Sequence, residues 1–173
     1  MILRRAHAGE LQELQGLEQR AGERFADVGL PDIATGPNLP LEVLEQARQE
    51  GLLWVAAEPG GPPLGFLAAE EAGSWLHVHE LDVEPLRQGE GLGASLLEAA
   101  FAEAGLRGLK GVSLTTFGAV PWNAPYYLRR GFEIVDPSRA DPALRALWDH
   151  EESLRAQGPR VLMVRRGVVR PSA

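Results

Sequence analysis

The chain has 173 residues, a length that fits one domain with a sizeable core. Its net charge is -7 and it has no basic run or nucleic-acid motif, which argues against binding to nucleic acid and suits an amine-bearing small substrate better. It contains no cysteine, which excludes disulfides, a thiol nucleophile and a cysteine-based metal site. We find no signal peptide and no apolar stretch of the ~20 residues that a membrane span needs, so we expect a cytoplasmic protein without a membrane partner.

The first half of the chain alternates short apolar strands with amphipathic helices. In chain order, the spacing predicts a strand at 2–5, a helix at 11–22, a loop at 25–39, a helix at 40–51 and strands at 52–57 and 64–69. The two strands are joined by a segment rich in proline and glycine, which favours a hairpin. Loops as long as the predicted one often form lids or walls of substrate sites.

The centre of the chain combines a strand, a glycine-rich loop and a helix. Residues 75–83 alternate with period two and predict a strand, which must end before Pro85 because proline cannot donate to a ladder. The glycines of the loop are Gly89, Gly91 and Gly93. From Leu92 the apolar spacing becomes helical. Free N–H groups at a helix start, next to glycines that allow close approach, predict an anion site.

The spacing of this loop distinguishes between phosphate ligands. A P-loop needs a lysine after its last glycine, and a dinucleotide loop needs G-x-G-x-x-G; neither pattern is present. The pattern that fits is Gln88-x-x-Gly91-x-Gly93 after the L-x-V-x-P end of the strand. It resembles the acetyl-CoA pyrophosphate loop of the GNAT superfamily of N-acetyltransferases. An ordinary tight turn is the alternative interpretation.

The second half of the chain continues the alternation of strands and helices. We predict strands at 111–117, 132–135 and 161–169, a short helix between Asn123 and Gly131, and a helix from Asp141-Pro142 to Gly158 with Asp141 as its cap. This order implies an α/β (α+β) fold, a mixed sheet with helices on both faces. It resembles the GNAT fold over essentially the whole chain. The resemblance implies a single acetyltransferase domain over residues 1–173, a mostly antiparallel sheet with a splayed central strand pair, and one extra helix near the C-terminus.

A second motif agrees with this resemblance. Asn123 and Tyr127 precede Gly131-Phe132, and the superfamily's element places a tyrosine four residues before the glycine. That offset selects Tyr127 over Tyr126. The resemblance implies that Tyr127 protonates the departing thiolate and that Asn123 contacts the CoA arm, although Asn and Tyr usually stand further apart. The alternative is a tyrosine packed on the helix with its hydroxyl exposed.

The resemblance also implies acetyl-CoA as co-substrate. The cofactor-binding residues that it implies are Leu81, Asp82, Val83, Gln88, Gly89, Glu90, Gly91, Leu92, Gly93, Ala94, Asn123 and Tyr127. Backbone groups near 81–83, freed where two strands splay, are implied to bind pantetheine and to polarise the thioester carbonyl.

Three side chains of the predicted strand are candidate bases. His77 and His79 share one face by period two, and a histidine titrating near ~6.5 can take a proton from an ammonium group. Their spacing resembles the His-x-His pair of arylalkylamine N-acetyltransferases; a buried structural pair is the alternative. Glu80 points to the other face of the strand. It is a further candidate base, because a β-bulge can turn its side chain to the face of the two histidines. Two histidines without an apparent third ligand do not predict a metal site.

These motifs lead to one main function and two alternatives. The main prediction is an acetyl-CoA-dependent N-acetyltransferase that acts on a primary amine of a small molecule. Acetylation of a protein or peptide shares every motif, and a non-catalytic CoA-binding module is the third hypothesis. Acceptor identity depends on variable loops and cannot be predicted, and a homodimer stays open.

Overall fold

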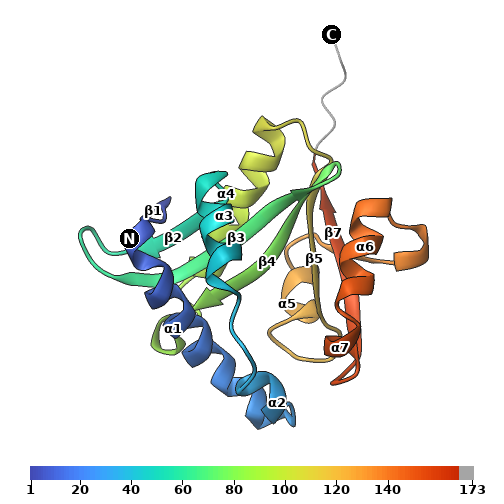
Figure 1. Cartoon of the computed structure of the whole chain (residues 1–173), viewed down its shortest axis with the longest axis horizontal. Coiled ribbons are helices and arrows are strands. Elements are labelled where there is room, and N and C mark those ends of the chain that lie inside the picture. The colour runs from blue at the N-terminus through green and yellow to red at the C-terminus, as the bar shows by residue number, and fades with distance from the viewer. Residues whose placement is uncertain (168–173) are drawn as a thin grey trace. The chain divides into compact units, whose positions relative to one another are not determined.

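The computed structural model describes residues 1–167 (Figure 1). The chain divides into two compact units. The first consists of Met1–Glu70 with Val78–Ala100, and the second of Glu71–His77 with the chain from Phe101 onward. Residues 1–167 contribute seven strands to a mostly antiparallel sheet, in agreement with the predicted α/β class. No helix of this part of the chain is both long and apolar enough to cross a membrane. The single domain over 1–173 stays a prediction.

The first unit begins with a strand and a set of helices. Its elements up to the hairpin are β1 (Ile2–Arg5), η1 (Ala8–Glu10), α1 (Leu11–Gly22), η2 (Glu23–Val28), α2 (Pro31–Ala34), α3 (Leu41–Gln49), β2 (Leu53–Ala57) and β3 (Pro63–Ala72). They follow the predicted order, and the predicted loop at 25–39 contains η2 and α2. Antiparallel pairing joins β1 to β2 and β2 to β3, and β4 (Trp75–Val83) follows β3 in the strand order.

Helices cover both faces of β3 in the first unit, as predicted. Phe66 belongs to a core cluster with Leu14, Leu17 and Leu44, which come from α1 and α3. Successive strand residues point to opposite faces, so Gly65 lies on the other side. A Cβ atom at Gly65 would lie 3.4 Å from Cδ1 of Leu96, in helix α4 (Leu92–Leu106). The backbone of β3 therefore approaches α4 closely on this face.

The second unit is built on three antiparallel strands. Its elements are β5 (Gly111–Phe117), α5 (Ala124–Leu128), β6 (Glu133–Val135), η4 (Pro137–Arg139), α6 (Pro142–His150), α7 (Glu152–Arg155) and β7 (Arg160–Arg166). The strand order is β5-β7-β6. Of the strand predicted at 161–169, the observed part ends at Arg166, and Val168 and Val169 lie outside the described residues. The predicted splaying of the central strand pair involves one strand from each unit, and it stays a prediction.

The extra helix near the C-terminus is present as two helices. The helix α6 ends at His150 and α7 begins at Glu152. Glu151 lies between them, and its Oε1 accepts a hydrogen bond from Thr115 Oγ1 at 2.7 Å.

Asp141 occupies the N-cap position with Pro142 directly after it, as predicted, but its side chain forms no capping hydrogen bond. Its Oδ2 instead accepts from Trp75 Nε1 at 2.5 Å and from Lys110 Nζ at 3.0 Å. Those two donors lower the pKa of Asp141.

Candidate functional site

The glycine loop follows β4 with the geometry that an anion site needs. The strand ends at Val83, η3 (Pro85–Arg87) follows, and α4 begins at Leu92. Gly89 and Gly91 have φ of +85° and +86°, which side-chain-bearing residues rarely adopt. No heavy atom of the described residues, apart from chain neighbours, lies within 4 Å of the position that a Cβ would take on either glycine. A ligand can therefore reach the backbone of this loop directly.

The start of α4 adds hydrogen-bond donors to this loop. The backbone N–H of Ser95 donates to the carbonyl of Gly91 at 3.0 Å, the first bond of the helical pattern. Helix geometry leaves the preceding N–H groups, those of Leu92, Gly93 and Ala94, without an acceptor inside the helix. Together with the helix dipole, such groups stabilise a bound phosphate.

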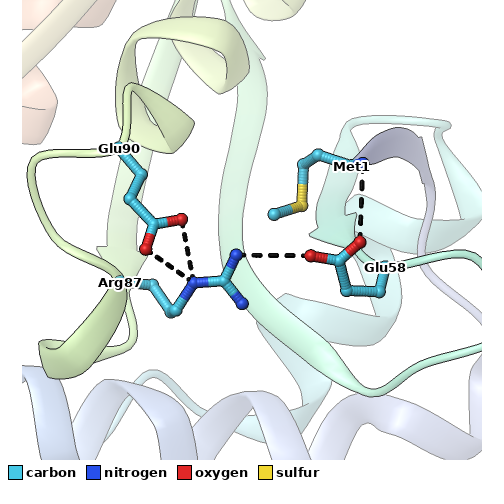
Figure 2. A network of polar contacts seen from close by, with 4 residues as sticks. All are labelled: Met1, Glu58, Arg87 and Glu90. Carbon is cyan, nitrogen blue, oxygen red and sulfur yellow. Dashed lines mark hydrogen bonds and ion pairs between the residues drawn. The ribbon is translucent and has the colours of Figure 1, made fainter.

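Two side chains of the loop have specific partners in the first unit. Gln88 Oε1 accepts from Arg24 of η2 at 2.6 Å, and Gln88 Nε2 donates to the carbonyl of Val83 at 3.3 Å. Glu90 accepts from Arg87, whose Nε lies 2.8 Å from both carboxylate oxygens (Figure 2). Gln88 thus fixes the start of the loop to the end of β4, and Glu90 is paired within the loop.

The two histidines of β4 have different surroundings. His77 is 2% exposed, and its Nδ1 lies 3.0 Å from the hydroxyl of Ser113 in the second unit. His79 belongs to the first unit and is half-buried, with Nε2 3.5 Å from Oε1 of Glu70. His77 has the burial that a structural histidine would have, and His79 keeps access to solvent.

Three carboxyl groups of the first unit form a cluster that sequence analysis did not find. Glu80 and Asp82 share one face of β4, and Glu18 of α1 interacts with both. Burial and the charge of Glu80 raise the pKa of Glu18 to about 8. Burial, the nearby Glu80 and Glu18, and a hydrogen bond with Glu80 raise the pKa of Asp82. The cluster therefore holds protons at neutral pH, because neighbouring carboxylates cannot all ionise at normal cost.

The position of Glu18 on α1 explains why the sequence did not indicate it as a member of the acidic cluster. It follows the buried Leu17 directly and stands four residues after the buried Leu14, so it lies at the border of the apolar stripe of α1. Both of its oxygens accept from the backbone N–H of Leu39, at 2.8 and 3.0 Å. A glutamate beside a buried helical stripe is the only hint in the sequence. Among residues 1–167, no group of three or more acidic or histidine side chains could hold a metal ion.

We expect Glu18→Gln to increase the free energy of unfolding at pH 8 more than at pH 5. An unfolded glutamate ionises near pH 4.5, whereas folded Glu18 keeps its proton up to about pH 8. The folded state therefore binds more protons within this window, and wild-type stability falls as pH rises through it. Glutamine cannot ionise and keeps an oxygen for Leu39. The gain at pH 8 should be about 1–2 kcal/mol, below the full linkage value because the side chain is partly solvated.

Urea unfolding at several pH values measures this effect. Glu13→Gln, at an exposed position of the same helix, is the matched control and should leave the pH dependence unchanged. Parallel stability curves for wild type and Glu18→Gln between pH 5 and 8 would show that the cluster does not hold the extra proton.

The tyrosines of α5 have distinct environments in the second unit. Asn123 precedes the helix, and its carbonyl accepts from the N–H groups of Tyr126 and Tyr127 at 2.8 and 3.1 Å. The ring of Tyr126 is covered by the guanidinium of Arg130 at 3.5 Å, and burial raises the pKa of Tyr126. The ring of Tyr127 makes edge contacts with Tyr126 at 5.2 Å and with Phe132 at 5.5 Å.

The predicted site residues are thus divided between the units. The first unit brings together His79, Glu80, the end of β4 at 81–83 and the loop from Gln88 to Ala94. His77, Asn123 and Tyr127 belong to the second unit.

Comparisons with known proteins identify a family model and similar folds. Residues 49–134 match the family model described as acetyltransferase (GNAT) domain. The structure of Rv2747 from Mycobacterium tuberculosis in complex with CoA is similar with 18% identity and a TM-score of 0.72, over 97% of this chain and 100% of that one. The ribosomal-protein-S18-alanine N-acetyltransferase from Escherichia coli is similar with 16% identity and a TM-score of 0.66, over 99% and 97% of the two chains. N-acetylglutamate synthase from Neisseria gonorrhoeae, complexed with coenzyme A and N-acetyl-glutamate, has 18% identity and a TM-score of 0.69, over 95% of this chain and 34% of that one.

Proposed function

The chain belongs to the GNAT superfamily and is an N-acetyltransferase, and we propose that it moves an acetyl group from acetyl-CoA directly to the primary amine of a small molecule. One observation carries the cofactor assignment: Gly89 and Gly91 adopt positive φ and present open backbone directly before the N-terminus of α4. This arrangement fits a pyrophosphate, because glycine allows close approach and the helix start supplies donors.

Acetyl-CoA would be held mainly by backbone groups of the first unit. The N–H groups of 89–94 would bind the pyrophosphate, and backbone groups of 81–83 would bind the pantetheine arm and polarise the thioester carbonyl. Gln88 supports the loop through Arg24 and Val83 rather than through the ligand. The thioester supplies an activated acetyl group, so the chain needs no nucleophile of its own.

The amine must lose a proton before it can attack, because an alkylammonium has a pKa of about 10. We assign this proton to Glu80. Its hydrogen-bonded neighbour Asp82 has a raised pKa, and carboxyls that share a proton titrate in steps, one of them well above the ordinary value. Because the hydrogen bond with Glu80 raises the pKa of Asp82, Asp82 holds the proton of the pair and the Glu80 carboxylate accepts the proton of the amine. His79, half-buried beside Glu70, is the second candidate, and His77 is the third because it is 2% exposed.

Release of free thiol from acetyl-CoA in the presence of an amine tests the proposed function. A screen of small amines, aminoglycosides and peptides should give amine-dependent thiol release with at least one small amine. Release with peptides alone would assign the enzyme to protein or peptide acetylation. Tight CoA binding without release for any acceptor would favour a non-catalytic CoA-binding module.

The same assay identifies the base. At subsaturating amine, we expect the rate to rise with pH as the base loses its proton. Glu80→Gln should abolish this rise, whereas His77→Gln and His79→Gln should keep it. A flat profile for His79→Gln, with a normal profile for Glu80→Gln, would transfer the role to the histidine.

A further inference from the structure

We propose that Arg87 neutralises the carboxylates beside the glycine loop, so that the loop can accept the phosphates of coenzyme A. The inference rests on the proposed function, because it concerns the affinity of the same loop for its ligand. It assigns Arg87 a role as a positioning residue that acts through Glu90 and Glu58 instead of contacting the ligand.

The contacts of Arg87 are specific and lie within the first unit. Its Nε donates to both oxygens of Glu90 at 2.8 Å, and one terminal nitrogen lies 3.3 Å from Oε1 of Glu58 (Figure 2). Glu58 stands in the turn between β2 and β3, directly after Ala57. Arg87 therefore connects the loop to the hairpin. The N-terminal ammonium of Met1 lies 3.5 Å from the other oxygen of Glu58, so two positive charges face two negative ones (Figure 2).

Glu90 creates the electrostatic problem that this contact relieves. It lies between Gly89 and Gly91, the two residues whose open backbone would meet the phosphates, and its side chain is 45% exposed. A carboxylate at this position repels a phosphate, since like charges at a protein surface interact over the Debye length of ~10 Å at 0.1 M salt. An anion site that contains an unpaired glutamate would oppose its own ligand.

The charge states favour a permanent pair. Hydrogen bonds from Arg87 lower the pKa of Glu58, so this carboxylate stays ionised at neutral pH, and bonds to Glu90 and Glu58 raise the pKa of Arg87. A comparable pairing occurs just before the loop, where Arg20 of α1 donates to Glu84. Glu84, just before the loop, and Glu90, within it, are thus each paired with an arginine.

Binding measurements on a double-mutant cycle test the proposal. We expect Arg87→Gln to weaken coenzyme A binding about tenfold in calorimetry at low salt, because Glu90 loses its partner. Glu90→Gln should leave the affinity unchanged or increase it, and the double variant should recover most of the loss. The effect of Arg87→Gln should shrink as salt rises. Pantetheine, which has no phosphate, should bind all four proteins equally.

The matched control is Arg48→Gln on α3. Arg48 pairs with Glu45 at the same spacing of three residues, with distances of 2.7 and 2.8 Å and similar exposure, but in a different element. Its substitution should not change the affinity for coenzyme A.

The possible outcomes distinguish a failure of the role proposed for Arg87 from a failure of the proposed function. A double variant as weak as Arg87→Gln alone, or a loss of affinity in Glu90→Gln, would mean that Arg87 contacts the phosphates itself and would overturn the proposal. A wild-type protein that does not bind coenzyme A would overturn the proposed function, and this inference with it.

Discussion

Tyr127→Phe is expected to lower turnover by about 100-fold or more while acetyl-CoA binds almost as tightly as to the wild type. The substitution removes one hydroxyl group, which is the proposed proton donor to the departing thiolate. It keeps the ring that contacts Tyr126 at 5.2 Å and Phe132 at 5.5 Å, so α5 should remain packed. Steady-state thiol release gives the turnover, and calorimetry gives the affinity.

Tyr126→Phe is the control for this experiment. Tyr126 stands in the same short helix, and a phenylalanine there would keep the stacking with Arg130 at 3.5 Å. Its turnover should stay close to wild type. Equal turnover for the two variants would refute the role of Tyr127. A loss in Tyr126→Phe alone would move the acid role by one residue along the helix.

The central part of the first unit could be predicted from the sequence because it depends on local chemistry. Pro85 ends β4, and the change from period two to helical spacing at Leu92 marks the start of α4; both boundaries agree with the structure. Gly89 and Gly91 occupy the positive-φ positions that a tight loop needs. Backbone restrictions of proline and glycine act within a few residues, so they can be read without tertiary information.

The acidic cluster could not be predicted because it depends on distant parts of the chain. Glu18 and Glu80 are separated by most of the first unit, and only the packing of α1 brings them together. The alternating pattern of β4 likewise did not predict which face of the strand is buried. The strand is buried on both faces from Trp75 to Val78, so period two does not separate core from solvent there.

The same limit applies to Asp141 and to Arg87. An aspartate before a helical proline predicts the N-cap position correctly, but the carboxylate accepts hydrogen bonds from the indole of Trp75 and the ammonium of Lys110 instead of capping the helix. Arg87 and Glu90 have a spacing that allows an ion pair. The proposed role of this ion pair follows only from the structure, which shows open backbone at the glycines on both sides of Glu90.

Gly91→Val is expected to weaken acetyl-CoA binding by about 100-fold or more, which corresponds to about 2.7 kcal/mol. Gly91 has φ of +86°, a conformation that costs an ordinary residue about 1–2 kcal/mol and a β-branched residue more. The valine side chain would also occupy the space beside the loop that is open in the described residues and that the pyrophosphate would use. Calorimetry with coenzyme A measures the loss, and circular dichroism verifies that the fold is intact.

Gly108→Val separates the two causes of this effect. Gly108 also has positive φ, +68°, no described residue apart from its chain neighbours lies within 4 Å of a Cβ placed there, and it follows the C-terminal end of α4. This variant should suffer a similar loss of stability but keep its affinity for coenzyme A. If Gly91→Val folds and binds coenzyme A as well as Gly108→Val does, the glycine loop is not the pyrophosphate site, since a branched side chain cannot share the space of a bound phosphate.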